Sequence, residues 1–174
     1  MNIFAKVIKL EDFTYSKVSF YSIVFEGKTT EENEFYDFLT RMESIEEIEN
    51  DLSNLLSWID EIGENYGAKK KYFRPEGIHA DTSALPPPRF QMLSDELIVE
   101  NLRLYCFVAN EHIVFLFNGG IKTELKAQDC PNVGMYIKQA NDLTRAIEHL
   151  FNKEIFWNED FTDLKFKADL EIEI

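Results

Sequence analysis

One stretch of the chain decides its fold: Asn101–Lys126, which reads N-L-R-L-Y-C-F-V-A-N-E-H-I-V-F-L-F-N-G-G-I-K-T-E-L-K. It holds two apolar runs, Leu102–Ala109 and His112–Phe117, that are rich in aromatic and β-branched residues. A short polar break separates the runs, and Asn118-Gly119-Gly120 follows the second run as a turn. This pattern predicts a β-hairpin with a bulge or a tight turn after it.

The first strand of this hairpin alternates between two faces, because side chains along a strand repeat every two residues. The alternation predicts that Arg103 and Tyr105 project from the same face, together with Phe107. The opposite face is purely apolar and carries Leu102, Leu104, Cys106 and Val108.

Two helices are predicted before the hairpin. Thr29 and Glu32 have the capping-box spacing and open a short helix to about Met42. Ser44 and Glu47 have the same spacing and open a longer helix, which we expect Gly67 to end. Apolar residues along this longer helix repeat at spacings of three and four, as an amphipathic helix requires: Ile45, Ile48, Leu52, Leu55, Leu56, Ile59 and Ile62.

Strands are predicted near both ends of the chain. Met1–Leu10 and Lys17–Phe25 are rich in strand-forming residues, and the tail from Thr162 to Ile174 alternates apolar and charged side chains. Between the longer helix and the hairpin, the prolines of Tyr72–Pro88 predict an extended loop. We expect a further strand in Arg89–Glu100, centred on Met92–Leu93 or on Leu97–Val99.

A later helix is predicted after the hairpin, with Asp129-Cys130-Pro131 at its start and its end near Phe151. Residues 1–174 are therefore predicted to form a single α+β domain with a mostly antiparallel sheet built on Leu102–Phe117. The two N-terminal helices and the later helix pack on this sheet. We expect the Ile45–Ile62 helix and the later helix to cover the same face.

Charge is unevenly distributed along the chain, whose net charge is −14. Residues 1–66 carry 5 basic and 15 acidic side chains, a net of −10, and residues 127–174 carry 5 and 10, a net of −5. Residues 67–126 carry 8 basic and 7 acidic side chains, a net of +1. An acidic chain repels phosphate at long range, so nucleic-acid binding would require a local basic cleft in the middle third.

Composition and motifs exclude several classes of protein. No apolar run is long enough to cross a bilayer, lysines interrupt the N-terminal apolar residues, and the two cysteines make no disulfide framework. These features predict a cytoplasmic protein without a membrane segment. The sequence contains no glycine-rich phosphate loop and no His/Cys metal spacing, so no cofactor and no metal are expected.

A basic and aromatic set remains as the candidate site. Arg103, Lys122 and Tyr105 are the candidate catalytic residues, and Arg74, Arg89 and Lys126 are the candidate substrate-binding residues. Cleavage of a phosphodiester without a metal needs cations that stabilise the phosphate and a group that moves the proton of the attacking hydroxyl. Ordinary salt bridges of Arg103 and Lys122 within an acidic protein are the alternative interpretation.

The segment L-R-L-Y-C-F-V-A-N-E-H-I-V-F-L-F-N-G-G-I-K-T resembles the RelE/HigB-like toxins of toxin–antitoxin systems, where an arginine-bearing strand precedes an apolar strand and a lysine-bearing loop. The order of elements from about Phe20 to Leu150 is similar as well. The resemblance aligns Arg103 and Lys122 with basic residues of the family's active cleft, and Arg89 with an arginine on the preceding strand. The chain is longer and more acidic than those toxins.

The resemblance implies a metal-free endoribonuclease that acts on mRNA, usually on the ribosome, and that an antitoxin protein neutralises. The alternative is a non-enzymatic acidic binding protein of the immunity or anti-defence type. Such a protein would present the acidic N-terminal helices to a basic partner. No motif of the sequence indicates the substrate, the partner or the oligomeric state of the protein.

Overall fold

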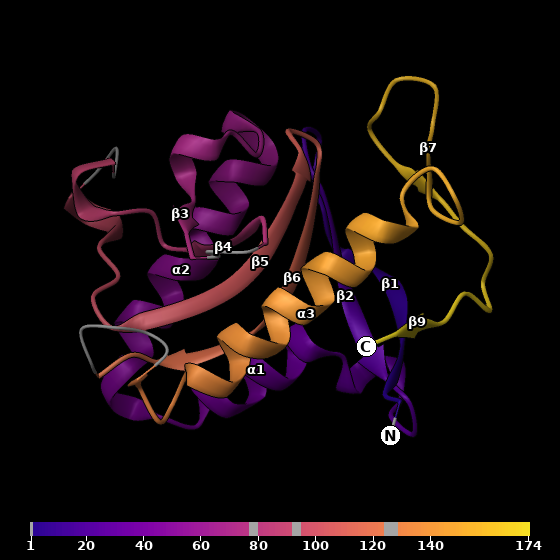
Figure 1. Cartoon of the computed structure of the whole chain (residues 1–174). Coiled ribbons are helices and arrows are strands. Elements are labelled where there is room, and N and C mark those ends of the chain that lie inside the picture. The colour runs from indigo at the N-terminus through magenta and orange to yellow at the C-terminus, as the bar shows by residue number, and fades with distance from the viewer. Residues whose placement is uncertain (1, 77–79, 92–94, 124–128) are drawn as a thin grey trace.

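The architecture is a sheet with helices on both faces (Figure 1). The computed structural model describes residues 2–76, 80–91, 95–123 and 129–174. Within this part of the chain, seven strands form one sheet in the order β3-β4-β5-β6-β2-β1-β9. All neighbouring strands are antiparallel except β2 and β6, which pair in parallel. The predicted α+β class with a mostly antiparallel sheet is therefore confirmed.

The centre of the sheet is the predicted hairpin, formed by β5 (Leu102–Asn110) and β6 (Ile113–Ile121). Two register shifts of the bulge type interrupt its pairing. The predicted turn at Asn118-Gly119-Gly120 is wrong, because β6 continues through these residues and pairs with the start of β5. Glycines suit this position since the two backbones approach each other closely there.

Short strands lie at both edges of the sheet. These edge strands are β3 (Arg74–Pro75) and β9 (Ile172–Glu173). The remaining strands of the sheet are β1 (Phe4–Thr14), β2 (Ser19–Phe25) and β4 (Thr82–Leu85). The predicted continuous strand in the tail is wrong: it contains only β8 (Leu164–Lys165) and β9, with a turn from Lys167 to Leu170 between them. β8 pairs with β7 (Phe156–Trp157) in a separate two-stranded sheet.

The first two helices are α1 (Glu34–Glu43) and α2 (Glu49–Glu61). Thr29 and Glu32 form the expected capping box, but it opens a 3-10 turn, and Asn33 caps α1 by accepting a hydrogen bond from the backbone N–H of Tyr36.

The second predicted capping box, at Ser44 and Glu47, is wrong. The Ser44 hydroxyl donates backwards to the carbonyl of Arg41, and a 3-10 turn, Glu46–Ile48, precedes α2. At its other end, α2 continues as a π-helical turn, Ile62–Tyr66, and Gly67 follows with a φ of 76°, which fits the predicted helix end.

The later helix is α3 (Gly134–Leu150), which begins after the predicted start at Asp129-Cys130-Pro131. In the described part of Arg89–Glu100 there are two 3-10 turns, Arg89–Gln91 and Asp95–Leu97, and the strand expected at Leu97–Val99 is absent. The other position expected for that strand, Met92–Leu93, lies outside the described residues.

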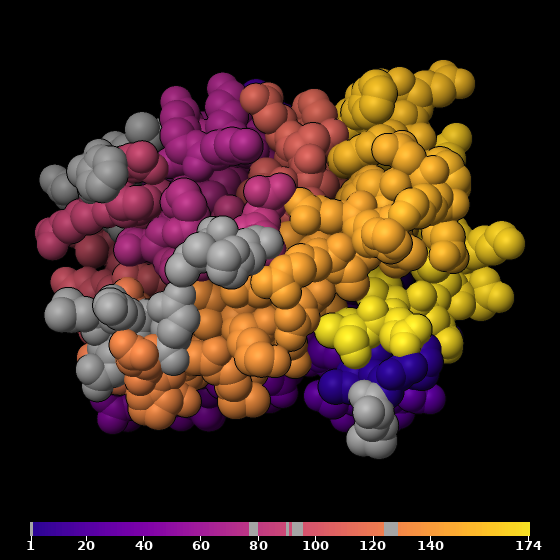
Figure 2. All heavy atoms as spheres, in the orientation of Figure 1, coloured from indigo at the N-terminus to yellow at the C-terminus, as the bar shows by residue number. Residues whose placement is uncertain are grey.

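Two hydrophobic cores lie on opposite faces of the sheet, so the expectation that α2 and α3 cover one face is wrong. Leu104 and Cys106 of β5 pack in the core beneath α1 and α2, whereas Tyr105 and Phe107 pack in the core beneath α3. Both faces of β5 are buried, and each therefore needs its own layer of helix. Figure 2 shows α3 across the middle of its face with the C-terminal segment beside it.

Within the described residues, no helix is both long enough and apolar enough to cross a membrane.

Candidate functional site

Arg74, Ala84 and Tyr105 form a row across three neighbouring strands. β3 pairs Arg74 with Ala84, and β4 pairs Ala84 with Tyr105. Directly paired residues project from the same face of a sheet, and Ala84 and Tyr105 belong to the core beneath α3. Arg103 precedes Tyr105 by two residues and shares that face, as the alternation of the sequence predicts. The arginines of β3 and β5 therefore lie on the α3 face.

Lys122 joins this group from the end of the hairpin. Its backbone N–H donates to the carbonyl of Asn101 at 2.6 Å, one residue beyond the pair formed by Leu102 and Ile121. The hydrogen bond holds Lys122 beside the start of β5, where Arg103 also lies.

Arg74 and Glu76 form an ion pair at the edge of the sheet. The Arg74 Nε lies 3.9 Å from Oε1 of Glu76, and only 13% of the Glu76 side chain is exposed. The same guanidinium donates to the carbonyls of Pro86 and Pro87, at 3.4 Å each. The proline run thus orients Arg74 toward the carboxylate.

Arg103 is buried, with 7% of its surface exposed. Its Nη1 donates to the carbonyls of Leu102 at 2.9 Å and Glu100 at 3.3 Å, but its Nε meets no hydrogen-bond partner among the described residues. A buried cation without a full set of partners is costly. This cost is typical of a site that is completed by a ligand.

Arg74, Glu76, Arg103 and Lys122 form what we call the cationic cluster, because their charges act on one another. Burial is the main cause that raises the pKa of Glu76, and Arg74, Lys122 and Arg103 act against it. Burial also lowers the pKa of Arg103 and of Lys122, and the neighbouring cations lower both pKa values further. The charges of three cations therefore act on one carboxylate, which leaves an excess of positive charge for an anion.

The hydroxyl of Tyr105 lies beside this cluster. Its oxygen is buried and has no hydrogen-bond partner in the described part of the chain. Burial, and then the charge of Glu76, raise the pKa of Tyr105, while the charge of Arg103 acts in the opposite direction. The phenol therefore stays protonated at neutral pH and can donate a hydrogen bond or a proton to a negatively charged group.

A hollow of about 500 Å³ opens beside the cluster. Arg74, Arg89 and Arg103 line it, together with Pro88, Ile98, Val99 and Glu100. Arg89 is exposed, so this side chain can contact a ligand from the solvent side. The sixth candidate residue, Lys126, lies outside the described residues.

Glu76 is a member of the site that the sequence analysis missed. It follows Arg74 by two residues in the extended stretch F-R-P-E-G, and this alternation is the only signal that could have indicated a shared face. One carboxylate among many acidic residues gives no further sign of a special role.

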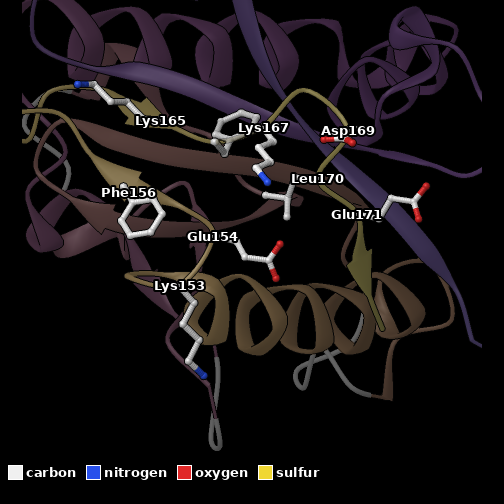
Figure 3. A pocket seen from close by; sticks show the side chains of 9 residues that line it. Lys153, Glu154, Phe156, Lys165, Lys167, Asp169, Leu170 and Glu171 are labelled. Carbon is white, nitrogen blue, oxygen red and sulfur yellow. The ribbon is translucent and has the colours of Figure 1, made fainter.

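A second hollow, of about 600 Å³, lies near β7, β8 and β9 (Figure 3). Lys153, Lys165 and Lys167 line it opposite Glu154, Asp169 and Glu171, so its charges balance. Figure 3 shows the side chain of Lys167 directed toward the space above Glu154. None of the candidate residues lies there, and the balanced charge gives it no preference for an anion.

The acidic surface of the N-terminal half is the other feature that the sequence analysis singled out. Its carboxylates on and beside α1 and α2 are exposed and, within the described residues, form no salt bridge: Glu43, Glu46, Glu47, Glu49, Asp60 and Glu64. We call this set the acidic surface.

The described residues contain no group of three or more His, Cys, Asp or Glu side chains arranged to hold a metal ion. Comparison of the chain with protein-family models, with curated proteins and with solved structures found no match. The chemistry of the cationic cluster is therefore the main indication of a function.

Proposed function

We propose that this chain is a RelE/HigB-like toxin, a metal-free endoribonuclease that cleaves mRNA in the cytoplasm and is neutralised by an antitoxin protein. The observation that carries the proposal is the cationic cluster, in which the charges of Arg74 on β3, Arg103 on β5 and Lys122 just after β6 act on Glu76. Tyr105 lies beside this cluster. Cations that approach from several elements can meet the charge of a reacting phosphodiester. The resemblance of the hairpin to those toxins supports the same function.

The reaction that suits this set is attack of a ribose 2′-hydroxyl on the adjacent phosphorus. A bond forms between the 2′-oxygen and phosphorus, and the bond from phosphorus to the 5′-oxygen breaks. The products are a 2′,3′-cyclic phosphate and a 5′-hydroxyl end. DNA lacks the attacking hydroxyl and is not a substrate in this scheme.

Each member of the site has a role in this reaction. Glu76 accepts the proton of the 2′-hydroxyl, since burial raises its pKa and makes it a better base. Arg74, Arg103 and Lys122 stabilise the negative charge that develops on the phosphate. Tyr105 gives a proton to the leaving 5′-oxygen, and Arg89 contacts a neighbouring phosphate across the hollow.

The test is cleavage of a single-stranded RNA oligonucleotide by the purified protein in the presence of EDTA. We expect fragments with 2′,3′-cyclic phosphate ends and no cleavage of the matching DNA. Arg103→Ala combined with Lys122→Ala should lower the rate by a factor on the order of 10² or more, as loss of a charge-stabilising group does. Expression of the wild-type protein alone should slow growth, and the double variant should relieve the effect.

Lys165→Ala with Lys167→Ala is the matched control, since it removes two cations from the other hollow (Figure 3). Because Arg103 is buried, Arg103→Lys serves as a second variant that keeps the charge but loses the planar donors. Equal activity of the wild type and the Arg103 and Lys122 variants, at unchanged thermal stability, would contradict the proposal.

A second candidate function is a non-enzymatic binding protein that presents the acidic surface to a basic partner. The observation in its favour is that the exposed carboxylates of this surface form no salt bridge within the described part of the chain. This candidate predicts no RNA cleavage and full growth when the wild-type protein is expressed without a partner gene.

A further inference from the structure

Two carboxyl groups meet at a joint between α3 and the sheet. Glu148 lies in the last turn of α3, and Asp81 immediately precedes β4. Both residues line one hollow, and a hydrogen bond between their side chains requires that one of the two carboxyl groups holds a proton. The contact joins parts of the chain that are far apart in sequence.

A second contact lies next to this pair in the same joint. The hydroxyl of Thr82 donates to that of Thr144 at 3.1 Å, and both residues are buried. Thr144 lies one turn before Glu148 on α3, so the two side chains are on the same face of the helix. Their partners, Thr82 and Asp81, are neighbours in the chain. The threonine pair fixes the position at which the two carboxyl groups meet.

The surroundings of the pair are mostly uncharged. A hollow of about 370 Å³ beside it is lined by Phe107, Val108 and Ala109 of β5, by Thr82 and Ser83 of β4, and by Phe73 and Pro75. Lys70 is the cation that lines this hollow. On α3 itself, Arg145 and His149 adjoin Glu148 in the sequence, and they contact Asp142 and Lys153 respectively.

These surroundings explain the ionisation of Glu148. Burial, then the hydrogen bond with Asp81, and then the charge of Asp81 raise the pKa of Glu148 to about 7. The Glu148 carboxyl is therefore neutral in mildly acidic solution and loses its proton near neutrality. Loss of the proton places two negative charges side by side.

We propose that Asp81 and Glu148 form a latch operated by a proton. While the proton is shared, the latch fastens the last turn of α3 to the start of β4. When the proton leaves, the two carboxylates repel each other and the joint loosens.

The latch acts on the segment that carries part of the cationic cluster. The backbone N–H of Glu76 donates to the carbonyl of Thr82 at 3.0 Å, so Glu76 extends the pairing of β3 with the start of β4. A change at Asp81 is transmitted through this pairing to Arg74 and Glu76. The effect on RNA cleavage rests on the proposed function, whereas the latch itself does not.

The latch is tested by NMR titration of the side-chain carboxyl carbons and backbone amides between about pH 3 and pH 9, a range that brackets ordinary and raised carboxyl pKa values. We expect Glu148 to titrate near 7 and the amides of Thr82 and Thr144 to follow the same midpoint. Asp81→Asn should shift the midpoint of Glu148 toward the ordinary 4.5.

Glu148→Gln supplies a permanent hydrogen-bond donor to Asp81. It should remove the titration midpoint near neutral pH from the amides of Thr82 and Thr144. Glu154→Gln, which changes an exposed glutamate just beyond α3, is the matched control and should leave the midpoint in place. A Glu148 midpoint that is the same in the wild type and in Asp81→Asn would overturn the latch. So would amides that keep the neutral midpoint in Glu148→Gln.

Sulfate binding tests the link to the cationic cluster, because sulfate does not change its own charge in this pH range. The wild type should bind sulfate more weakly at about pH 8 than at about pH 6, and this difference should be smaller in Glu148→Gln. A difference that is as large in Glu148→Gln as in the wild type would overturn the link. Absence of sulfate binding at both pH values would contradict the proposed function, while the NMR titration still decides the latch.

Discussion

The carbonyl oxygen of Arg103 lies where a side chain on Gly119 would begin: a Cβ atom built there would be 1.9 Å from that oxygen. Gly119 pairs with Leu104 across the central hairpin, and its own carbonyl accepts a hydrogen bond from Nη2 of Arg41 at 2.8 Å. The close approach of β5 and β6 at this point determines where the backbone of Arg103 lies.

Gly119→Ala is therefore expected to push β6 away from β5 beside Arg103. The obstacle is backbone and cannot rotate away, so the cost should be at least in the range of about 1–3 kcal/mol that overpacking typically causes. Denaturant unfolding measures the change in the free energy of unfolding. An unchanged unfolding midpoint would show that the two strands are not held together as described.

Tyr105→Phe separates stability from activity. The phenol oxygen is buried without a partner among the described residues, so its removal should leave stability unchanged or raise it by about 1 kcal/mol. If Tyr105 gives a proton to the leaving oxygen, the cleavage rate should fall by roughly 10²–10⁴. Wild-type activity of this variant would exclude the proton-transfer role and leave the roles of the cations intact.

Leu55→Ala and Ile59→Ala test the face of α2 that packs on the sheet. Both side chains are fully buried in the core beneath α1 and α2, and each truncation should cost on the order of 2–5 kcal/mol. Glu61→Ala, on the more exposed side of the same helix, should leave the free energy of unfolding within about 0.5 kcal/mol of the wild-type value. A series of thermal melts with the opposite ranking would mean that the buried face has been misassigned.

Acid stability should depend on the contact between Tyr21 and Asp163. Burial alone would raise the pKa of Asp163, but the hydrogen bonds from Tyr21 and Lys9 outweigh it and hold this pKa below the ordinary 3.8. A carboxyl whose folded-state pKa is lowered stabilises the fold above its unfolded-state pKa, and this stabilisation is lost as the pH falls through the folded-state pKa.

Tyr21→Phe removes one donor, so the variant should be less stable than the wild type at neutral pH, and this difference should narrow below about pH 4. Urea unfolding at a series of pH values measures it. A difference that stays constant from neutral to acidic pH would show that the Tyr21 hydroxyl does not act through the ionised Asp163.

The hairpin and the helices could be predicted because their signals are local. Alternation along β5 indicates which side chains share a face, and the spacing of apolar residues indicates α2. The arrangement of helices on both faces could not be predicted in the same way. It depends on whether a helix or solvent covers the face of β5 that carries Tyr105 and Phe107. The alternation of residues along the strand is the same in both cases.

The tail shows the limit of the alternation signal. Leu164 to Ile174 alternates well, yet a strand forms only where a partner is present, and the partners are β7 for Leu164–Lys165 and β1 for Ile172 and Glu173. At Gly119 and Gly120 the composition indicates a turn, whereas the actual cause of the glycines is the close approach of two strands.

The candidate site could be predicted only in part from the sequence. Arg103 and Tyr105 share a strand, so alternation alone relates them. Arg74 reaches the same face through the two short strands β3 and β4, which begin or end near prolines, where sequence patterns are weakest. The contact of Asp81 with Glu148 depends on the docking of α3, which no local pattern describes.

The parallel pair of β2 and β6 has a consequence for synthesis on the ribosome. Ser19 and Tyr21 pair with Ile113 and Phe115, so β2 is made long before its inner partner exists. Until β6 has left the exit tunnel, the N-terminal strands present an apolar edge that is open to other chains. We expect the nascent chain to need protection at that stage, and folding to be completed only after the central hairpin has been made.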